Sequence, residues 1–326
     1  MSRGWRHGVV ALGCLGLALL PSPGAGQSGE TAGVITELKI GRGRVELKRG
    51  AESDWRPAAP LQALRVGDAL RATEDASAVV VLSGGRASVR VDAASPFLLS
   101  QRAAEDTKLQ KAWALLDGSI SFLTAGGKES RPATLGTRGG SRPPVIVSPR
   151  NGLVLPESLT FEWTGSRVSR VTLRIVGPSG VILEQTGVTG PKFAYPPDAP
   201  KLAPGVRYTF QVITGGHPPH EAWFELLDAG RAEAVRADLT TLEQAAGPMP
   251  ASSLATVRAG YLARSGLAHD ARLQLVATLA KDPDEPTLHL LLGHLYRDTD
   301  LPGLAAEEYA KAQYLLRAPP TQKGKD

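Results

Sequence analysis

Near its C-terminal end the sequence repeats itself after 34 residues, and this periodicity constrains the fold more than any other feature. Ala271 recurs as Ala305, and Leu275 recurs as Tyr309. Such a repeat length is typical of a helical hairpin that buries its apolar face by stacking on a neighbouring hairpin. The two alanines are expected where the helices of one hairpin cross closely. The pattern therefore predicts stacked helical hairpins, an architecture that usually binds partners.

The second copy resembles the tetratricopeptide repeat. Its matching residues stand at the spacings of that family: Leu292, Gly293, Tyr296, Ala305, Tyr309 and Ala312. The first copy has Ala259 and Leu262 in place of the glycine and the first tyrosine. We assign residues 227–317 to this helical region and expect Ser252 or Ser253 to be a helix N-cap. Helices are predicted over 232–245, 254–264, 268–280, 287–297 and 304–316.

The predicted partner site lies on the first helix of the second hairpin. In tetratricopeptide repeats the first helices face a concave groove, and Leu290, His294 and Arg297 fall on that face of the predicted helix. We expect these residues to bind a peptide or an acidic partner. The alternative is that they form an ordinary solvated helix face.

From residue 34 to about residue 124 the pattern changes to a period of two with frequent turn residues, which predicts antiparallel strands. The hairpin signal is Ser83-Gly84-Gly85, because glycine tolerates the positive φ of such turns. We assign residues 27–125 to this β-domain. Strands are predicted over 34–40, 43–48, 77–82 and 87–91.

The same part of the chain resembles the FecR domain over about 90 residues. The landmarks of that family appear in order: Gly43-x-Val45-x-Leu47, Trp55-Arg56-Pro57-Ala58, Leu64-x-x-Gly67-Asp68-x-Leu70-Arg71-x-Thr73, Ser77-x-x-Val80-x-Leu82-Ser83-Gly84-Gly85 and Leu116-x-Gly118-Ser119-Ile120. The closing Gly-Thr-x-Phe element is replaced by Gly136-Thr137-Arg138-Gly139. The resemblance implies a role in envelope sensing or assembly, because FecR domains of iron-uptake regulators relay a signal between the two membranes.

The resemblance also bears on one ambiguous segment. Residues 103–116, with the sequence AAEDTKLQKAWALL, have helix-forming propensities. In FecR-like domains the equivalent stretch is a strand that leads to the Leu-x-x-Gly turn. We therefore expect at least residues 111–116 to be extended.

A second β-unit is predicted after a segment rich in Gly, Pro and Arg. Residues 126–144 have the composition of a linker. Residues 145–226 contain short alternating runs whose spacing is typical of a small β-sandwich. The motifs Phe161-x-Trp163 and Pro204-Gly205-x-x-Tyr208 resemble immunoglobulin or fibronectin type III-like modules of bacterial surface proteins, which implies that Trp163 is a core residue. Strands are predicted over 146–149, 159–163, 171–176, 181–185 and 208–212.

The first 26 residues are predicted to be an export signal. Arg3 and Arg6 precede an apolar stretch, residues 9–20, which is shorter than the roughly 20 residues that span a bilayer. Cys14 is the only cysteine, which excludes an intramolecular disulfide, and a lipoprotein anchor through Cys14 is the less favoured alternative. We expect a periplasmic or extracellular protein without a membrane span and with a disordered tail over 318–326.

Composition and motifs favour a protein that is not an enzyme. The net charge of +5 is spread along the chain, without the clustered cations and aromatics of a nucleic-acid site. The chain contains none of the common nucleophile, phosphate-loop, dinucleotide or metalloprotease motifs. His217, His220 and Glu221 could hold a metal only if other ligands converged on them. Asp68 is expected to close a turn by hydrogen bonding to backbone groups, and no catalytic, cofactor or metal residue is assigned.

The predicted fold class is therefore multidomain, mainly β followed by α. We expect an exported scaffold that binds a protein partner of the bacterial envelope. The alternative is a peptidoglycan- or polysaccharide-binding protein that uses its two β-modules. Exposure of Trp55 and Trp223 on one concave face would favour a glycan, and burial of both would favour a protein partner.

Overall fold

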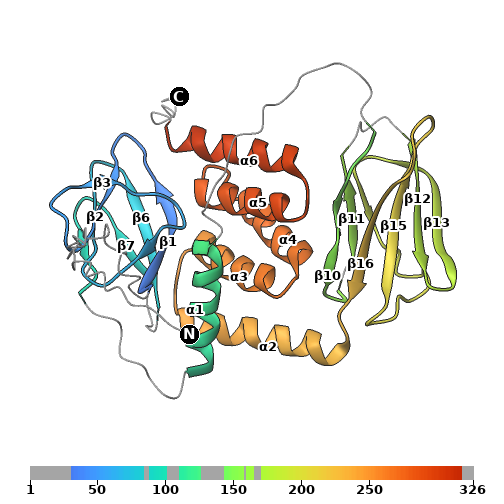
Figure 1. Ribbon diagram of the computed structural model, residues 1–326, viewed down its shortest axis with the longest axis horizontal. Helices are drawn as coiled ribbons and strands as arrows, with labels where there is room; N and C mark the ends of the chain where they lie inside the picture. Colours follow the sequence, from blue (N-terminus) through green and yellow to red (C-terminus); the bar gives the residue numbers. More distant parts are fainter. Residues whose placement is uncertain are drawn as a thin grey trace, which may run out of the picture. The chain divides into compact units, whose positions relative to one another are not determined.

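The computed structural model describes residues 31–83, 88–100, 110–125, 143–157, 159–164 and 170–317, which belong to one compact unit beginning at Thr31. Mostly antiparallel sheets make up its N-terminal part, and helices make up its C-terminal part (Figure 1). The predicted order, mainly β followed by α, is confirmed at this level. The predicted signal, positions 126–142 of the predicted linker and the predicted tail lie outside the described residues.

The first β-unit consists of two four-stranded sheets, ordered β4-β1-β6-β7 and β3-β2-β5-β8. Its strands are β1 (Gly33–Lys39), β2 (Val45–Lys48), β3 (Arg56–Pro57), β4 (Ala63–Leu64), β5 (Ala69–Ala72), β6 (Ser77–Leu82), β7 (Ser88–Val91) and β8 (Phe97–Leu98). Alternate side chains point into a shared apolar core, as in β5, where Leu70 and Ala72 are buried and Ala69 and Arg71 are not. The four strands predicted here correspond to β1, β2, β6 and β7, with ends that differ by at most two residues.

The second β-unit also contains two sheets, ordered β10-β16-β15-β12-β13 and β14-β11-β9. Its strands are β9 (Ile146–Ser148), β10 (Gly152–Val154), β11 (Thr160–Trp163), β12 (Arg170–Gly177), β13 (Gly180–Thr189), β14 (Lys192–Ala194), β15 (Arg207–Ile213) and β16 (His220–Leu226). The pairing of β10 with β16 is parallel, and the other pairings are antiparallel. Phe161, Trp163, Phe210 and Phe224 form its aromatic core, so the predicted burial of Trp163 is confirmed.

The helical region contains α2 (Ala229–Ala246), α3 (Ala251–Arg264), α4 (Ala268–Leu279), α5 (Pro286–Asp298) and α6 (Pro302–Leu315). Helices α3 and α4 form one hairpin, and α5 and α6 form the next (Figure 1). Ala271 and Ala305 are buried, as predicted for close helix crossings. Gly293 has the same role, because a Cβ atom there would lie 2.5 Å from the ring of Tyr309.

The start of α3 differs from the prediction. Its N-cap residue is Pro250, which offers no side-chain hydrogen bond, and Ser252 and Ser253 already belong to the first turn. The expectation that either serine is the N-cap is therefore wrong. Both serines are buried.

The segment after β8 also corrects a prediction. Residues 111–116, expected to be extended, lie in helix α1 (Gln110–Ala125), and the landmark Leu116-x-Gly118-Ser119-Ile120 lies in the same helix. Ile120 and Leu123 of α1 pack into the core of the helical region, where Leu123 lies against Gly260 of α3. Helix propensity thus agrees with the packing, and the analogy with FecR domains misassigned this segment.

Candidate binding groove

The three residues predicted to bind a partner do not lie together on an open surface. His294 is only 5% exposed, and its ring lies 5.6 Å from that of Tyr309 on α6. Burial, together with the charge of Arg297, lowers the pKa of His294 to about 4. Leu290 is half-buried against the helical core, and Arg297 forms an ion pair with Asp298 at 2.9 Å. The expectation that His294 lines an exposed groove or a solvated face is therefore wrong, because α6 covers it.

The face formed by α3 and α5 contacts strand β1 of the same chain. A bulge shifts the register of β1 against β6 between Ile35 and Glu37, and both Thr36 and Glu37 reach α3. The Thr36 hydroxyl donates to Ser253 Oγ at 2.9 Å. The Ser253 N–H and hydroxyl both donate to Glu37 Oε1 at 2.8 Å. Glu37 thus supplies the acceptor that Pro250 cannot provide at the start of α3.

Helix α5 is also joined to β1 by a hydrogen bond between a carboxyl group and a backbone N–H. Its N-cap residue, Glu285, accepts hydrogen bonds from the backbone N–H groups of Thr287 and Leu38, each at 3.2 Å. The Glu285 side chain is fully buried, and burial raises its pKa to about 7. At the rim, Lys39 forms an ion pair with Asp282 at 2.9 Å. This face of the helical region is consequently a docked interface and not an open groove.

The second β-unit is docked on the helical region through another set of contacts. Arg272 of α4 forms a buried ion pair with Glu162 of β11 at 2.5 Å and also donates to the Tyr296 hydroxyl. Burial raises the pKa of the Glu162 carboxyl, but its contacts with Arg272 and Lys192 together outweigh burial, and the pKa lies below its ordinary value. Asp270 accepts a hydrogen bond from the Leu155 N–H, and burial raises its pKa to about 7.

The same interface holds a serine and a histidine in contact. Ser148 Oγ lies 2.6 Å from His269 Nδ1, a geometry that can activate a serine nucleophile. Both residues are buried, and the space beside them has a volume of about 10 Å³, room for no more than one water. Burial, together with the charge of Arg272, lowers the pKa of His269 to about 4. A substrate has no access to this pair, so its contribution is to the interface.

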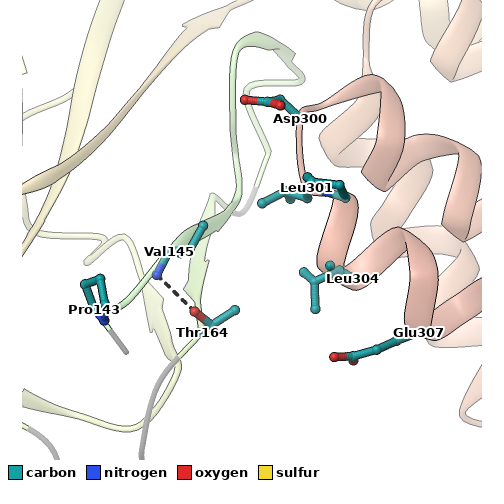
Figure 2. A pocket seen from close by; sticks show the side chains of 9 residues that line it. Pro143, Val145, Thr164, Asp300, Leu301, Leu304 and Glu307 are labelled. Atoms are coloured by element: carbon teal, nitrogen blue, oxygen red, sulfur yellow. Dashed lines mark hydrogen bonds between the residues drawn. The ribbon is translucent and has the colours of Figure 1, made fainter. Parts of the chain in front are cut away.

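An open groove lies beside α6. Figure 2 shows the two sides of the groove: the ends of strands in the second β-unit, and the turn before α6 together with the beginning of that helix. Its volume is about 460 Å³. The lining residues are Pro143, Val145, Thr164, Asp300, Leu301, Pro302, Gly303, Leu304 and Glu307.

The groove combines an apolar floor with an acidic rim. Leu301 is buried in the helical core, while Val145 and Leu304 are half-buried beside it. The Asp300 side chain is 88% exposed and lies 3.5 Å from an Arg150 guanidinium nitrogen, and Glu307 is exposed. Such a groove can accept an apolar side chain and attract a positive charge next to it.

Sequence reasoning did not find this groove. Its two sides come from segments far apart in the chain, and none of Leu290, His294 and Arg297 lines it. The one local signal is Asp300-Leu301-Pro302, a turn before a helix that opens with proline. A second pocket of about 460 Å³ lies on the second β-unit. Its lining carries charges of both signs, Lys201 and Glu157, so it does not favour a partner of either charge.

Other residues considered in the sequence take structural positions. Asp68 accepts hydrogen bonds from the N–H groups of Arg65 and Gly50, so its predicted turn-closing role is confirmed. Trp55 and Trp223 are half-buried, and each ring is covered by a guanidinium group at 4.2 and 4.1 Å respectively. Among the described residues, no three His, Cys, Asp or Glu side chains are grouped so that they could hold a metal ion.

Comparisons with known proteins add little to this geometry. The sequence matches no protein-family model and no curated protein. Among solved structures, fibronectin(III)-like modules of Clostridium thermocellum CbhA share 16% identity, with coverage of 26% of this chain and 95% of that chain and a TM-score of 0.19. At that TM-score the likeness supports no conclusion. Of the helices in the described ranges, none combines the length and apolar character needed to cross a bilayer.

Proposed function

We propose that the protein is a non-enzymatic scaffold of the bacterial envelope that binds a protein partner in the groove beside α6. The observation that carries this proposal is the groove itself, with its apolar floor and acidic rim. We infer an architecture in which a tetratricopeptide-like helical region joins a FecR-like β-domain to an immunoglobulin-like module. The export signal over residues 1–26 belongs to the same proposal.

The chemistry of the groove defines the partner. Val145, Leu301 and Leu304 can bury one or two apolar side chains, at about 25 cal/mol per Å² of apolar surface removed from water. Asp300 and Glu307 at the rim favour a lysine or arginine in the next position. We infer that the partner contributes an extended segment with alternating apolar and basic residues.

The docked faces of the helical region support a scaffold. Hydrogen bonds and ion pairs connect α3 and α5 to β1, and they connect α4 to the second β-unit. A helical region fixed on both sides holds the two walls of the groove in a constant geometry, which lowers the entropy cost of binding.

Glycan binding by the two β-units remains the second candidate. Trp55 and Trp223 are aromatic platforms of the kind that stack on sugars. Each ring already has a guanidinium group over it, from Arg71 and Arg207 respectively, and a sugar would compete with that contact. Co-sedimentation of the protein with insoluble peptidoglycan, lost on substitution of either tryptophan, would favour this candidate over the groove.

The groove is tested with fluorescent peptides of about ten residues, one alternating Leu with Lys and one alternating Leu with Glu. We expect the Leu/Lys peptide to bind more tightly, with a dissociation constant raised roughly tenfold by Glu307→Lys and by Leu304→Ser. Glu233→Lys on α2 is the matched control, because Glu233 is an exposed helical glutamate away from the groove. Equal binding of both peptides, or equal effects of Glu307→Lys and Glu233→Lys, would refute the proposal.

A further inference from the structure

The outer face of one sheet in the first β-unit has an unusual composition. Pairing in the sheet β3-β2-β5-β8 aligns Lys48 with Ala69 and Ala69 with Leu98. The adjacent row aligns Pro57 with Glu46 and Glu46 with Arg71. Because the neighbours Leu47 and Leu70 point into the core, these two rows point away from it. We call this surface the basic face and define it by Arg44, Lys48, Trp55, Val66, Arg71 and Leu98.

The positive charges of the basic face are accessible, whereas its carboxylate is not. The side chain of Arg44 is 67% exposed and that of Arg71 is 41% exposed. Glu46, which pairs with both at 3.1 and 2.7 Å, is only 9% exposed. Lys48 and Arg71 also lie over the Trp55 ring, at 5.5 and 4.2 Å. Among these four side chains, three cations therefore surround one shielded anion, which gives the group a net charge of about +2.

Apolar side chains stand next to these charges. Leu98 is 59% exposed and Val66 is 52% exposed, which places both among the few large apolar side chains of the described residues that face water. They come from adjoining segments, because the Gly67 N–H donates to the Leu99 carbonyl at 2.7 Å. A surface with exposed aliphatic groups, a tryptophan and basic residues matches the interfacial region of a membrane, where charged headgroups lie above apolar chains.

We propose that the basic face binds the surface of a membrane that contains anionic lipids. Arg44, Lys48 and Arg71 contact the phosphate-bearing headgroups, while Leu98 and Val66 enter the boundary between headgroups and acyl chains. The apolar residues distinguish a lipid surface from a soluble polyanion, since Leu98 and Val66 gain no burial from a polyanion in water. Attachment of this kind is peripheral and reversible, because each cation contributes only a few-fold to affinity.

This surface is independent of the proposed groove. The first β-unit contacts the helical region mainly through β1, which belongs to its other sheet. Within the described residues, the ion pairs and ring contacts of Arg44, Lys48 and Arg71 stay inside the first β-unit. None of its residues lines the groove beside α6. Failure of one proposal therefore leaves the other standing.

The test is sedimentation of the full chain with vesicles of phosphatidylcholine that contain about 30% phosphatidylglycerol, compared with vesicles of phosphatidylcholine alone. We expect binding to the anionic vesicles only, weakened by salt. Lys48→Gln should lower the partition coefficient about fivefold, and Leu98→Ser should lower it several-fold. Leu98 is exposed, and Lys48 is half-buried with its ammonium group over the Trp55 ring, so a thermal melt of each variant should lie close to that of the unmodified protein.

Matched controls come from the second β-unit. Arg207→Gln is the control for Lys48→Gln, because each change removes a cation that lies over a tryptophan ring. Val181→Ser is the control for Leu98→Ser, because Val181 is an apolar side chain that is 56% exposed. Neither change should alter vesicle binding. Equal binding to both kinds of vesicle would overturn the proposal. Full competition by soluble polyphosphate with no effect of Leu98→Ser would also overturn it, and would assign the basic face to a polyanion instead.

Discussion

Strand β1 and the second β-unit each donate one backbone N–H to a carboxyl group of the helical region. Leu38 donates to Glu285 at the start of α5, and Leu155 donates to Asp270 in the first turn of α4. Burial raises the pKa of both carboxyl groups to about 7. The two docked faces therefore share a contact whose strength depends on a proton.

The faces differ in the rest of their polar contacts. The β1 face adds the hydroxyl and carboxylate contacts of Ser253 with Thr36 and Glu37, without a buried cation. The face toward the second β-unit adds the buried ion pair of Arg272 with Glu162. Loss of the Ser253 hydroxyl leaves Glu37 with the Ser253 N–H as a donor and Thr36 with the Val79 carbonyl as an acceptor. Loss of Arg272 instead leaves a buried carboxylate poorly compensated. The second β-unit should therefore depend more strongly on a single side chain.

The largest expected effect follows from that difference. Arg272→Met should lower the free energy of unfolding by about 3–5 kcal/mol, because it leaves Glu162 buried with only Lys192 as a cationic partner. Urea denaturation at neutral pH measures this value. Arg174→Met is the matched control, since its ion pair with Glu184 is exposed and should contribute at most about 1 kcal/mol. Equal losses in the two variants would remove the distinction between the faces.

The next effect tests what the faces share. Between the ordinary Glu pKa near 4.5 and the folded value near 7, the folded protein keeps a proton on Glu285 that the unfolded chain releases. This contribution to stability is fully present below the lower value and is lost as the pH rises toward 7. The unmodified protein should therefore lose up to about 3 kcal/mol in its free energy of unfolding between pH 5 and pH 8 through Glu285, and Glu285→Gln should abolish that part of the loss. Urea denaturation at both pH values measures the difference.

Asp270→Asn provides the same test on the other face. It should flatten the pH dependence in the same direction, and the double variant should flatten it more than either single variant, since the two groups contact different β-units. His269 acts in the opposite sense, because its lowered pKa means that stability is lost as the pH falls from 6.5 toward 4. A pH profile unchanged in both single variants would show that neither carboxyl group is protonated in the folded protein.

Many of the strands, and the helices α2 to α6, could be predicted from the sequence because their signals are local. Alternation placed β1, β2, β6 and β7 to within two residues, and the 34-residue repeat placed the helices of the last two hairpins almost as closely. The small residues Ala271, Gly293 and Ala305 also carried reliable information, since only small side chains allow the close contacts found there.

The docked faces and the groove could not be read in the same way. Thr36 and Ser253 stand 217 positions apart, and no periodicity in either segment shows that they meet. His294 was assigned to an open face because helical spacing gives a direction but not the identity of the covering element. Helix α1 was missed for a different reason. The resemblance to FecR domains was given more weight than the helix propensity of the segment, and the packing of Leu123 on Gly260 agrees with the propensity.

The smallest effect concerns the hydroxyl contacts that are specific to the β1 face. Ser253→Ala removes one of two acceptors of the Thr36 hydroxyl and one of two hydrogen bonds from Ser253 to Glu37, and should cost about 1–3 kcal/mol of stability. Ser252→Ala is the matched control in the same helical turn, because it loses a single contact with Asp282 at the rim. Urea denaturation measures both losses of stability. If Ser253→Ala loses less than Ser252→Ala, apolar packing holds the β1 face together and its polar contacts contribute little to stability.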